Sequence, residues 1–406
     1  MAIKIKPLGV GRSVRALCLM MTLAILTQRF AIPLGATQLP VAFLLYWATV
    51  LWLTIDGLTV PHKLNAIVLW VSFGLILLCS LSTYGKTSIS SLLYLLALYL
   101  PLTMGATRSV TRENTREVAR YFVFLMVLFS IVGIWQYFSQ LILHIPYTDP
   151  IGNLPDAVIM QGYLASYPVS YGGDLYKSNA FVFLEASFLS QFVALAIVIE
   201  LSFWRRLWVL STLLLGLLVT FSGTGLMLLV AVTPFILIKN IKSLKVIALT
   251  VAAIVVLVGT VIMRPEVMVR VAEFGTSDTS ASARFIEPFT RMARYSTRTT
   301  SSLIAGYGAG SSDRLGSAGD SLVNYSAIPK AIIEYGLLGG LPLLLAIAAC
   351  ITLSVGSLPL VTALVLTHFV LSGALLQPIS VMLIYFFNVS TVRKKRLVRR
   401  DLTASI

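Results

Sequence analysis

Charged side chains are scarce in this sequence. Only 12% of its 406 residues are Asp, Glu, Lys or Arg, whereas 57% are hydrophobic. Soluble domains are about a quarter charged, so this composition excludes an ordinary water-soluble enzyme or binding domain. The hydrophobic residues form continuous runs rather than the alternating pattern of barrel strands, and such runs indicate membrane-spanning helices.

Residues that form disulfides or bind metals are also few, with 3 cysteines and 3 histidines. Each cysteine lies inside an apolar run, which predicts small buried side chains rather than a disulfide framework (Cys18, Cys79 and Cys350). The sequence has no histidine and carboxylate spacing typical of a zinc site. We therefore expect neither a metal nor another cofactor.

Acidic residues are the scarcer charged class, with 16 Asp and Glu against 31 Lys and Arg and a formal net charge of +15. Most of the basic residues lie in the tails and in short loops on one side of the apolar runs. The positive-inside rule produces this distribution, so membrane topology explains the charge better than binding to nucleic acid. Both termini are therefore predicted to be cytoplasmic.

The apolar runs predict an all-α polytopic membrane protein, a single bundle over residues 1–406 with about twelve transmembrane helices. Two longer loops, 145–178 and 264–327, are predicted to lie outside, because long loops cross the membrane largely regardless of charge. The predicted spans are 16–32, 39–55, 64–82, 89–106, 121–143, 181–201, 207–222, 225–238, 244–263, 328–353, 358–371 and 374–390.

Glu185 lies where the first outer loop enters an apolar run. An unpaired carboxylate inside a membrane span is costly. Two interpretations stay open: a functional carboxylate, or one stabilised by the helix dipole at a helix start. Lys177, about two helical turns earlier, is a candidate partner of Glu185 or a cation for a bound anion.

Arginines are frequent in the long outer loop. Arg284, Arg291 and Arg294 share one face if residues 282–294 are helical. Pro288 then requires a kink or an early helix position. A cationic face suits a phosphate-bearing ligand, because guanidinium pairs with phosphate bidentately. The alternative is a basic helix that lies on lipid headgroups.

A glycine-rich run and an acidic residue in a predicted span complete the candidates. The run, 306–310, includes Tyr307 and lacks the lysine of a nucleotide-binding loop. Asn324 follows it. Glu334 needs an interior partner or a water-filled cavity, and the glycines just after Glu334 allow close helix packing.

In this order, these segments resemble the O-antigen ligase and polysaccharide polymerase superfamily, and most of all Wzy-type polymerases. The resemblance covers residues 177–340. The matching pieces are the segment 179–187, the turn 222–225, Arg284, the run 306–310, and Asn324 with 334–339.

The resemblance implies a GT-C-like bundle in the bacterial inner membrane. Such proteins transfer a glycan from a polyprenyl-diphosphate-linked sugar to an acceptor hydroxyl at the outer face, without a nucleotide donor or a metal. Expected partners are this substrate, the lipid bilayer, a chain-length regulator and a flippase. The resemblance makes Arg284 a candidate catalytic residue. It leaves the general base unassigned, with Glu185 and Glu334 as the candidates. The substrate-binding candidates are Lys177, Arg291, Arg294, Tyr307 and Asn324. We expect the long loop and the segment 177–185 to form opposite walls of one site.

This chain departs from the ligase pattern of the superfamily at one position. Ligases have a histidine before the exit asparagine, whereas this chain has Val323 before Asn324, which favours a polymerase. His368 is predicted to be a packed interior residue. The alternatives are an O-antigen ligase acting on the lipid A core, a twelve-span transporter, and a non-catalytic component of a polysaccharide export complex.

Overall fold

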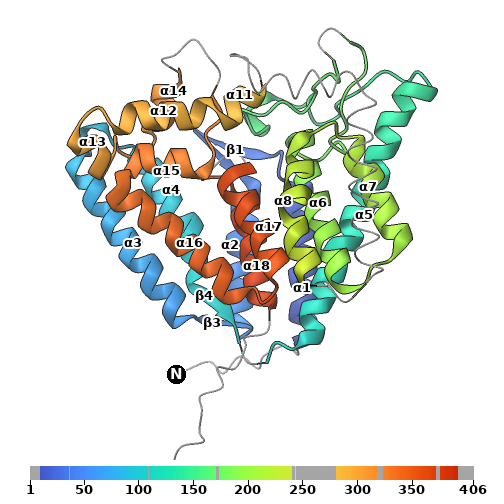
Figure 1. Ribbon diagram of the computed structural model, residues 1–406, viewed down its shortest axis with the longest axis horizontal. Helices are drawn as coiled ribbons and strands as arrows, with labels where there is room; N and C mark the ends of the chain where they lie inside the picture. The colour runs from blue at the N-terminus through green and yellow to red at the C-terminus, as the bar shows by residue number, and fades with distance from the viewer. Residues whose placement is uncertain are drawn as a thin grey trace, which may run out of the picture.

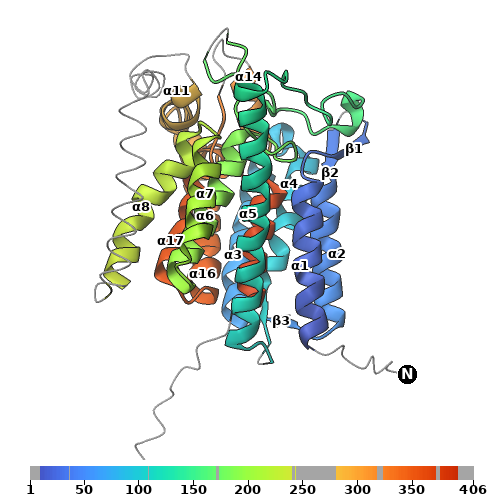
Figure 2. The ribbon, with the colours of Figure 1, turned by 90° about the vertical axis from the view of Figure 1, so that its right-hand side faces the viewer.

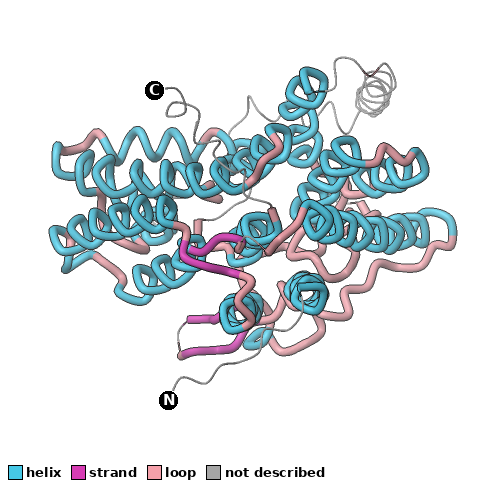
Figure 3. Tube along the Cα trace, turned by 90° about the horizontal axis from the view of Figure 1, so that it is seen from below, coloured by secondary structure: helices cyan, strands magenta, loops and turns pink. Residues whose placement is uncertain are grey.

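The computed structural model describes residues 10–35, 37–107, 109–170, 173–239, 243, 280–317, 323–371 and 375–391. Within these residues the chain is mostly helical, and its long helices form a bundle (Figures 1 and 2). The view from below shows how little strand there is among the helices and loops (Figure 3). The short strands form two antiparallel pairs that the sequence pattern did not predict.

The elements follow one another in chain order, with short connections from α1 to α5 and a long segment between α5 and α6. The bundle helices are α1 (Val10–Leu26), α2 (Val41–Ile55), α3 (Lys63–Ser82), α4 (Ile89–Tyr99), α5 (Arg112–Ile142), α6 (Ala186–Phe203), α7 (Leu207–Leu218), α8 (Gly223–Lys239), α15 (Ala327–Tyr335), α16 (Leu341–Ser354), α17 (Leu358–Leu366) and α18 (Pro378–Ser390). Four short helices lie between α8 and α15 in the described part of the long loop: α11 (Ser280–Phe285), α12 (Glu287–Ser296), α13 (Thr300–Ala305) and α14 (Ser311–Ser317). The strand pairs are β1 (Ala31–Leu34) with β2 (Thr37–Pro40), and β3 (Thr59–Pro61) with β4 (Met104–Ala106).

In the part of the chain that the structure describes, four helical segments are long and apolar enough to cross a membrane: Lys63–Ser82, Arg112–Ile142, Ala186–Phe203 and Ala327–Ser354. The last combines α15 and α16 through a π-helical turn, Gly336–Gly340. The other apolar helices of the described residues have 10–17 residues and coincide with predicted spans. The predicted span 244–263 lies outside the described residues. The structure thus supports a helical membrane protein, with four helices of membrane-spanning length.

The two ends of the bundle differ. Helix α1 begins and α18 ends at the same end, where Thr115 donates a hydrogen bond to the carbonyl of Ser390 over 2.6 Å (Figure 2). We call this the terminal end. The opposite end carries the segment 145–185 and the short helices, with α12 lying across the ends of the bundle helices (Figure 1). We call this the loop end.

Helix α6 is almost completely enclosed by the rest of the described bundle. Residues 186–201 are all buried, and apolar side chains surround the helix rather than forming one stripe, as expected of a helix enclosed by others. Its only charged residue, Glu200, accepts hydrogen bonds from Nε and Nη2 of Arg206 over 3.0 and 2.8 Å. Packing on all sides fixes α6, so the residue at its start, Glu185, has a defined position at the loop end.

Arg29 anchors the first outer loop to the end of α1. Its two terminal nitrogens donate to the two carboxylate oxygens of Asp149 over 2.7 and 2.6 Å. Burial opposes ionisation of Asp149, but the Arg29 guanidinium outweighs it and holds the pKa of the carboxyl below its usual range. Arg29 also donates to the carbonyl of Phe181 over 2.7 Å. One buried guanidinium therefore joins α1, the loop and the segment that leads to Glu185.

Candidate active site

An irregular turn held by buried hydrogen bonds precedes α6. The Oε1 atom of Gln136 in α5 accepts from the backbone N–H of Asn179 over 3.1 Å. Ala180 and Phe181 have φ values of 51° and 62°, a conformation that is uncommon for residues other than glycine. Such strain persists only where the surroundings enforce it. Here it turns the chain so that α6 begins at Ala186, and Glu185 becomes the residue that precedes the helix.

Glu185 forms an ion pair with Arg284 of α11. Arg284 Nη2 and Glu185 Oε2 lie 2.6 Å apart, although the residues are 99 positions apart in the sequence. Ser187 Oγ donates to the same carboxylate oxygen over 2.8 Å. The side chains of Arg284 and Glu185 are 26% and 14% exposed, so a ligand can reach a pair that is largely desolvated. The two expected walls of the site therefore meet at the loop end.

A second charged cluster surrounds Lys330 of α15. Its Nζ donates to both carboxylate oxygens of Asp313 over 2.8 and 2.9 Å, and lies 3.7 Å from Glu334 Oε1. Ser312 Oγ donates to the same Glu334 oxygen over 2.6 Å. The Glu334 side chain is 1% exposed, whereas that of Asp313 is 66% exposed. The cluster thus runs from the interior to the surface, and Glu334 has the interior partner that its place in a span requires.

Tyrosines connect the two clusters electrostatically. Burial raises the pKa of Tyr163, and the charges of Glu185 and Asp313 raise it further, so both carboxylates act on one hydroxyl. Burial also raises the pKa of Tyr325. The charge of Arg291 lowers this pKa, and the charge of Asp313 raises it.

The glycine-rich run serves as a packing element. The N–H groups of Tyr307 and Gly308 donate to the carbonyls of Ile333 and Glu334, each over 2.9 Å. Gly306 has a φ of 76°, and a Cβ atom there would lie 2.6 Å from the Glu334 carbonyl oxygen. These amides therefore bind the end of α15, which argues against their use as a phosphate-binding loop.

Comparison with known proteins gives no family. No family model, curated protein or solved structure matches the chain. The function of this protein therefore has to be inferred from its own residues and their geometry.

Residues 282–294 do not form one continuous helix, so the shared arginine face that a single helix would give is absent, and Pro288 takes the early helix position that was one of its two predicted places. Helix α11 ends at Phe285 and α12 begins at Glu287, with Pro288 in its first turn. Arg284 therefore lies on a different helix from Arg291 and Arg294, and it alone of the three is paired with Glu185. Arg291 Nε lies 3.6 Å from Glu287 and its Nη1 donates to the carbonyl of Leu315 over 3.4 Å, whereas Arg294 is exposed.

The remaining sequence candidates are held mainly by local contacts. Lys177 was predicted either to pair with Glu185 or to bind an anion. Its Nζ lies 4.3 Å from the ring centroid of Tyr167, and Glu185 pairs with Arg284. Tyr307 donates through its hydroxyl to the carbonyl of Tyr295 over 3.2 Å. The backbone N–H of Asn324 donates to the carbonyl of Ala283 over 2.9 Å, which attaches the end of the long loop to the helix that carries Arg284.

The structure adds three residues that the sequence reasoning missed, namely Tyr163, Asp313 and Lys330. Lys330 and Glu334 had a readable signal, since opposite charges four residues apart in an apolar run share a helix face. Asp313 and Tyr163 had no comparable signal, because only the tertiary fold brings their loops to α6 and α15. Among the described residues, no three His, Cys, Asp or Glu side chains are placed to hold a metal ion.

Gly336 provides a test of the junction between the long loop and α15. It has a φ of 62°, and a Cβ atom would collide with the Ile304 carbonyl. Gly336→Ala should cost about 2–4 kcal/mol, from left-handed backbone strain and overpacking, and lower the thermal unfolding temperature in detergent. Gly356→Ala is the control, because open space surrounds Gly356. Equal unfolding temperatures for the two variants would contradict the tight junction.

Proposed function

We propose that this protein is a polysaccharide polymerase that joins polyprenyl-diphosphate-linked oligosaccharide repeat units by glycosyl transfer. The observation that carries the proposal is the partly exposed ion pair between Arg284 and Glu185, from segments 99 residues apart, at one end of an apolar bundle. The superfamily resemblance described above assigns these same two residues to its site.

The charges at the loop end suit a diphosphate leaving group. Three cations near the loop end have carboxylate partners: Arg284 with Glu185, Lys330 with Asp313, and Arg291 with Glu287. An incoming diphosphate competes for these cations, and Arg284 offers it a bidentate partner. Because the site is partly desolvated, this charge balance is stronger than it is in water.

The reaction follows from that exchange of partners. When Arg284 binds the diphosphate, the Glu185 carboxylate is released and becomes available as a general base. The acceptor hydroxyl oxygen attacks the anomeric carbon of the donor glycan as the bond from that carbon to the diphosphate oxygen breaks. The acceptor proton passes to Glu185, and the polyprenyl diphosphate leaves with the bonding electron pair. Glu334 contributes through the Lys330 cluster, since it is buried away from solvent.

The proposed setting is the bacterial inner membrane, with about twelve spans, both termini in the cytoplasm and the loop end outside. The asymmetric basic residues of the sequence support this orientation. A lipid-linked substrate then reaches the loop end from within the bilayer. A flippase that delivers repeat units and a chain-length regulator are the proposed partners.

Reconstitution tests the proposal. Purified protein in liposomes containing polyprenyl-diphosphate-linked repeat units should produce a ladder of longer lipid-linked glycans without any nucleotide sugar. Glu185→Gln should slow chain extension about 10²–10⁴-fold, which is the usual contribution of a general base. Asp156→Asn, an exposed carboxylate of the same outer loop, is the control. Uptake of a solute with no glycan ladder would favour the transporter instead.

A further inference from the structure

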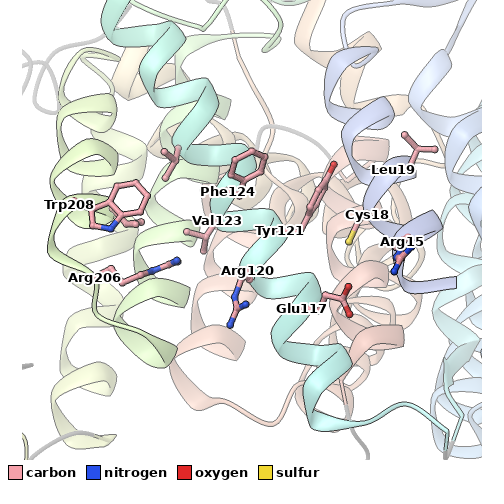
Figure 4. A pocket seen from close by; sticks show the side chains of 12 residues that line it. Arg15, Cys18, Leu19, Glu117, Arg120, Tyr121, Val123, Phe124, Arg206 and Trp208 are labelled. Carbon is pink, nitrogen blue, oxygen red and sulfur yellow. The ribbon is translucent and has the colours of Figure 1, made fainter. Parts of the chain in front are cut away.

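A cavity of about 450 Å³ lies between α1, α5 and the start of α7, at the terminal end and away from the candidate active site (Figure 4). Its volume falls in the range of small-ligand sites. Arg15, Arg120 and Arg206 line it together with apolar side chains. Figure 4 shows these arginines coming from three different elements around one opening. This cavity takes no part in the proposed glycosyl transfer.

The charges around the cavity leave a small positive excess. Glu117 is the acidic residue among the lining side chains, and Glu200 outside the lining pairs with Arg206. With Arg15 and Arg120 the sum is one positive charge. Both Arg15 and Arg120 are exposed, and the Arg120 guanidinium lies 5.6 Å from the ring centroid of Trp204. A single phosphodiester carries the one negative charge that balances this group.

The apolar side of the cavity continues along α5. Phe124 lines the cavity and is 52% exposed, and Leu128 and Ile131 follow at helical spacing with exposures of 43% and 50%. Leu19 of α1 is 55% exposed on the opposite wall. A cationic pocket that opens onto an exposed apolar strip matches an amphiphile with an anionic head and hydrocarbon chains.

We infer that this cavity binds the phosphate headgroup of an anionic phospholipid, with the acyl chains lying along Phe124, Leu128 and Ile131. With the terminal end on the cytoplasmic side, the ligand comes from the leaflet that is rich in anionic lipids. Arg15 and Arg120 bind the phosphate, and Trp208, which is 65% exposed at the rim, lies at headgroup depth. The inference uses the proposed orientation of the bundle but does not depend on the proposed glycosyl transfer.

Brominated lipids test the site, because bromine quenches nearby tryptophan fluorescence. Titration of the full-length protein in detergent with phosphatidylglycerol brominated at the headgroup end of its chains should give a saturable quench that Trp208→Phe reduces. Chain-brominated phosphatidylcholine should give no saturable component at Trp208. Equal quenching by the two lipids would show contact without headgroup selectivity and would overturn the inference. This comparison needs only the unaltered protein.

Variants then test the arginines. Arg15→Gln with Arg120→Gln should weaken phosphatidylglycerol binding about twenty-five-fold, because each cation strengthens binding to anionic lipid about fivefold. Arg112→Gln with Arg116→Gln is the matched control, since these exposed arginines of α5 lie outside the cavity lining. Equal loss in both pairs, or displacement of the lipid by millimolar inorganic phosphate, would overturn the inference.

Discussion

Arg284→Ala is expected to abolish chain extension, with a rate loss of about 10²–10³-fold or more, while the protein still inserts and folds. Removing one preorganised group that stabilises developing charge typically costs this much. Arg284→Lys should recover only part of the rate, because a point charge replaces the bidentate guanidinium. The measurement is the rate of glycan elongation in liposomes, with protein levels and unfolding temperature checked in parallel.

Arg298→Ala is the matched control for this experiment. Arg298 belongs to the same loop and is exposed, and its guanidinium lies 5.0 Å from the ring centroid of Tyr295. The proposed site does not use it, so its loss should leave elongation near the unaltered rate. Full activity of Arg284→Ala would remove Arg284 from the site and refute the exchange of partners between Glu185 and the diphosphate.

Lys330→Met is expected to destabilise the protein by about 3–5 kcal/mol, because it leaves the buried Glu334 without its cation. Adding Glu334→Gln should restore much of this loss, because the remaining side chain no longer carries a buried charge. Asp313 remains solvated in both variants, since its side chain is 66% exposed. Unfolding in mixed micelles, monitored by circular dichroism, measures the differences.

Lys86→Met is the comparison for this second prediction, because Lys86 is exposed and its loss should change stability by no more than about 0.5 kcal/mol. If Lys330→Met is as stable as Lys86→Met, the buried Glu334 carboxylate does not need the charge of Lys330 for stability. A double variant no better than Lys330→Met would assign the cost to packing around the lysine chain instead of to charge.

The positions of the helices were largely predictable, because continuous apolar runs report where the chain avoids water. The prediction 64–82 agrees with α3, Lys63–Ser82. The prediction 181–201 began too early, since the apolar run continues through a turn in which Ala180 and Phe181 have positive φ. Hydrophobicity indicates which residues are buried, and it does not indicate a positive φ. Hydrophobicity also does not fix how many helices cross the membrane, since among the described residues four helical segments reach spanning length.

The sequence predicted individual residues of the candidate site, but it did not predict which of them contact one another. Glu185 and Arg284 each had a signal, a carboxylate entering a span and an arginine in an outer loop. Their contact depends on tertiary packing across 99 residues, which the sequence does not encode as a spacing. The break after Phe285 and the hydrogen bonds of the glycine-rich run likewise depend on neighbours that are distant in sequence. By contrast, Lys330 and Glu334 lie four residues apart, so their pairing could have been read directly.

The contacts between the glycine-rich run and α15 also bear on the order of assembly during synthesis. The run leaves the ribosome first, yet its hydrogen-bond acceptors, the carbonyls of Ile333 and Glu334, belong to the helix that follows it. Gly336, which leaves room for the Ile304 carbonyl, is made later still. Chains fold from the N-terminus as they are made, but this loop has to wait for the next span. The candidate active site is therefore completed only after most of the bundle has entered the membrane.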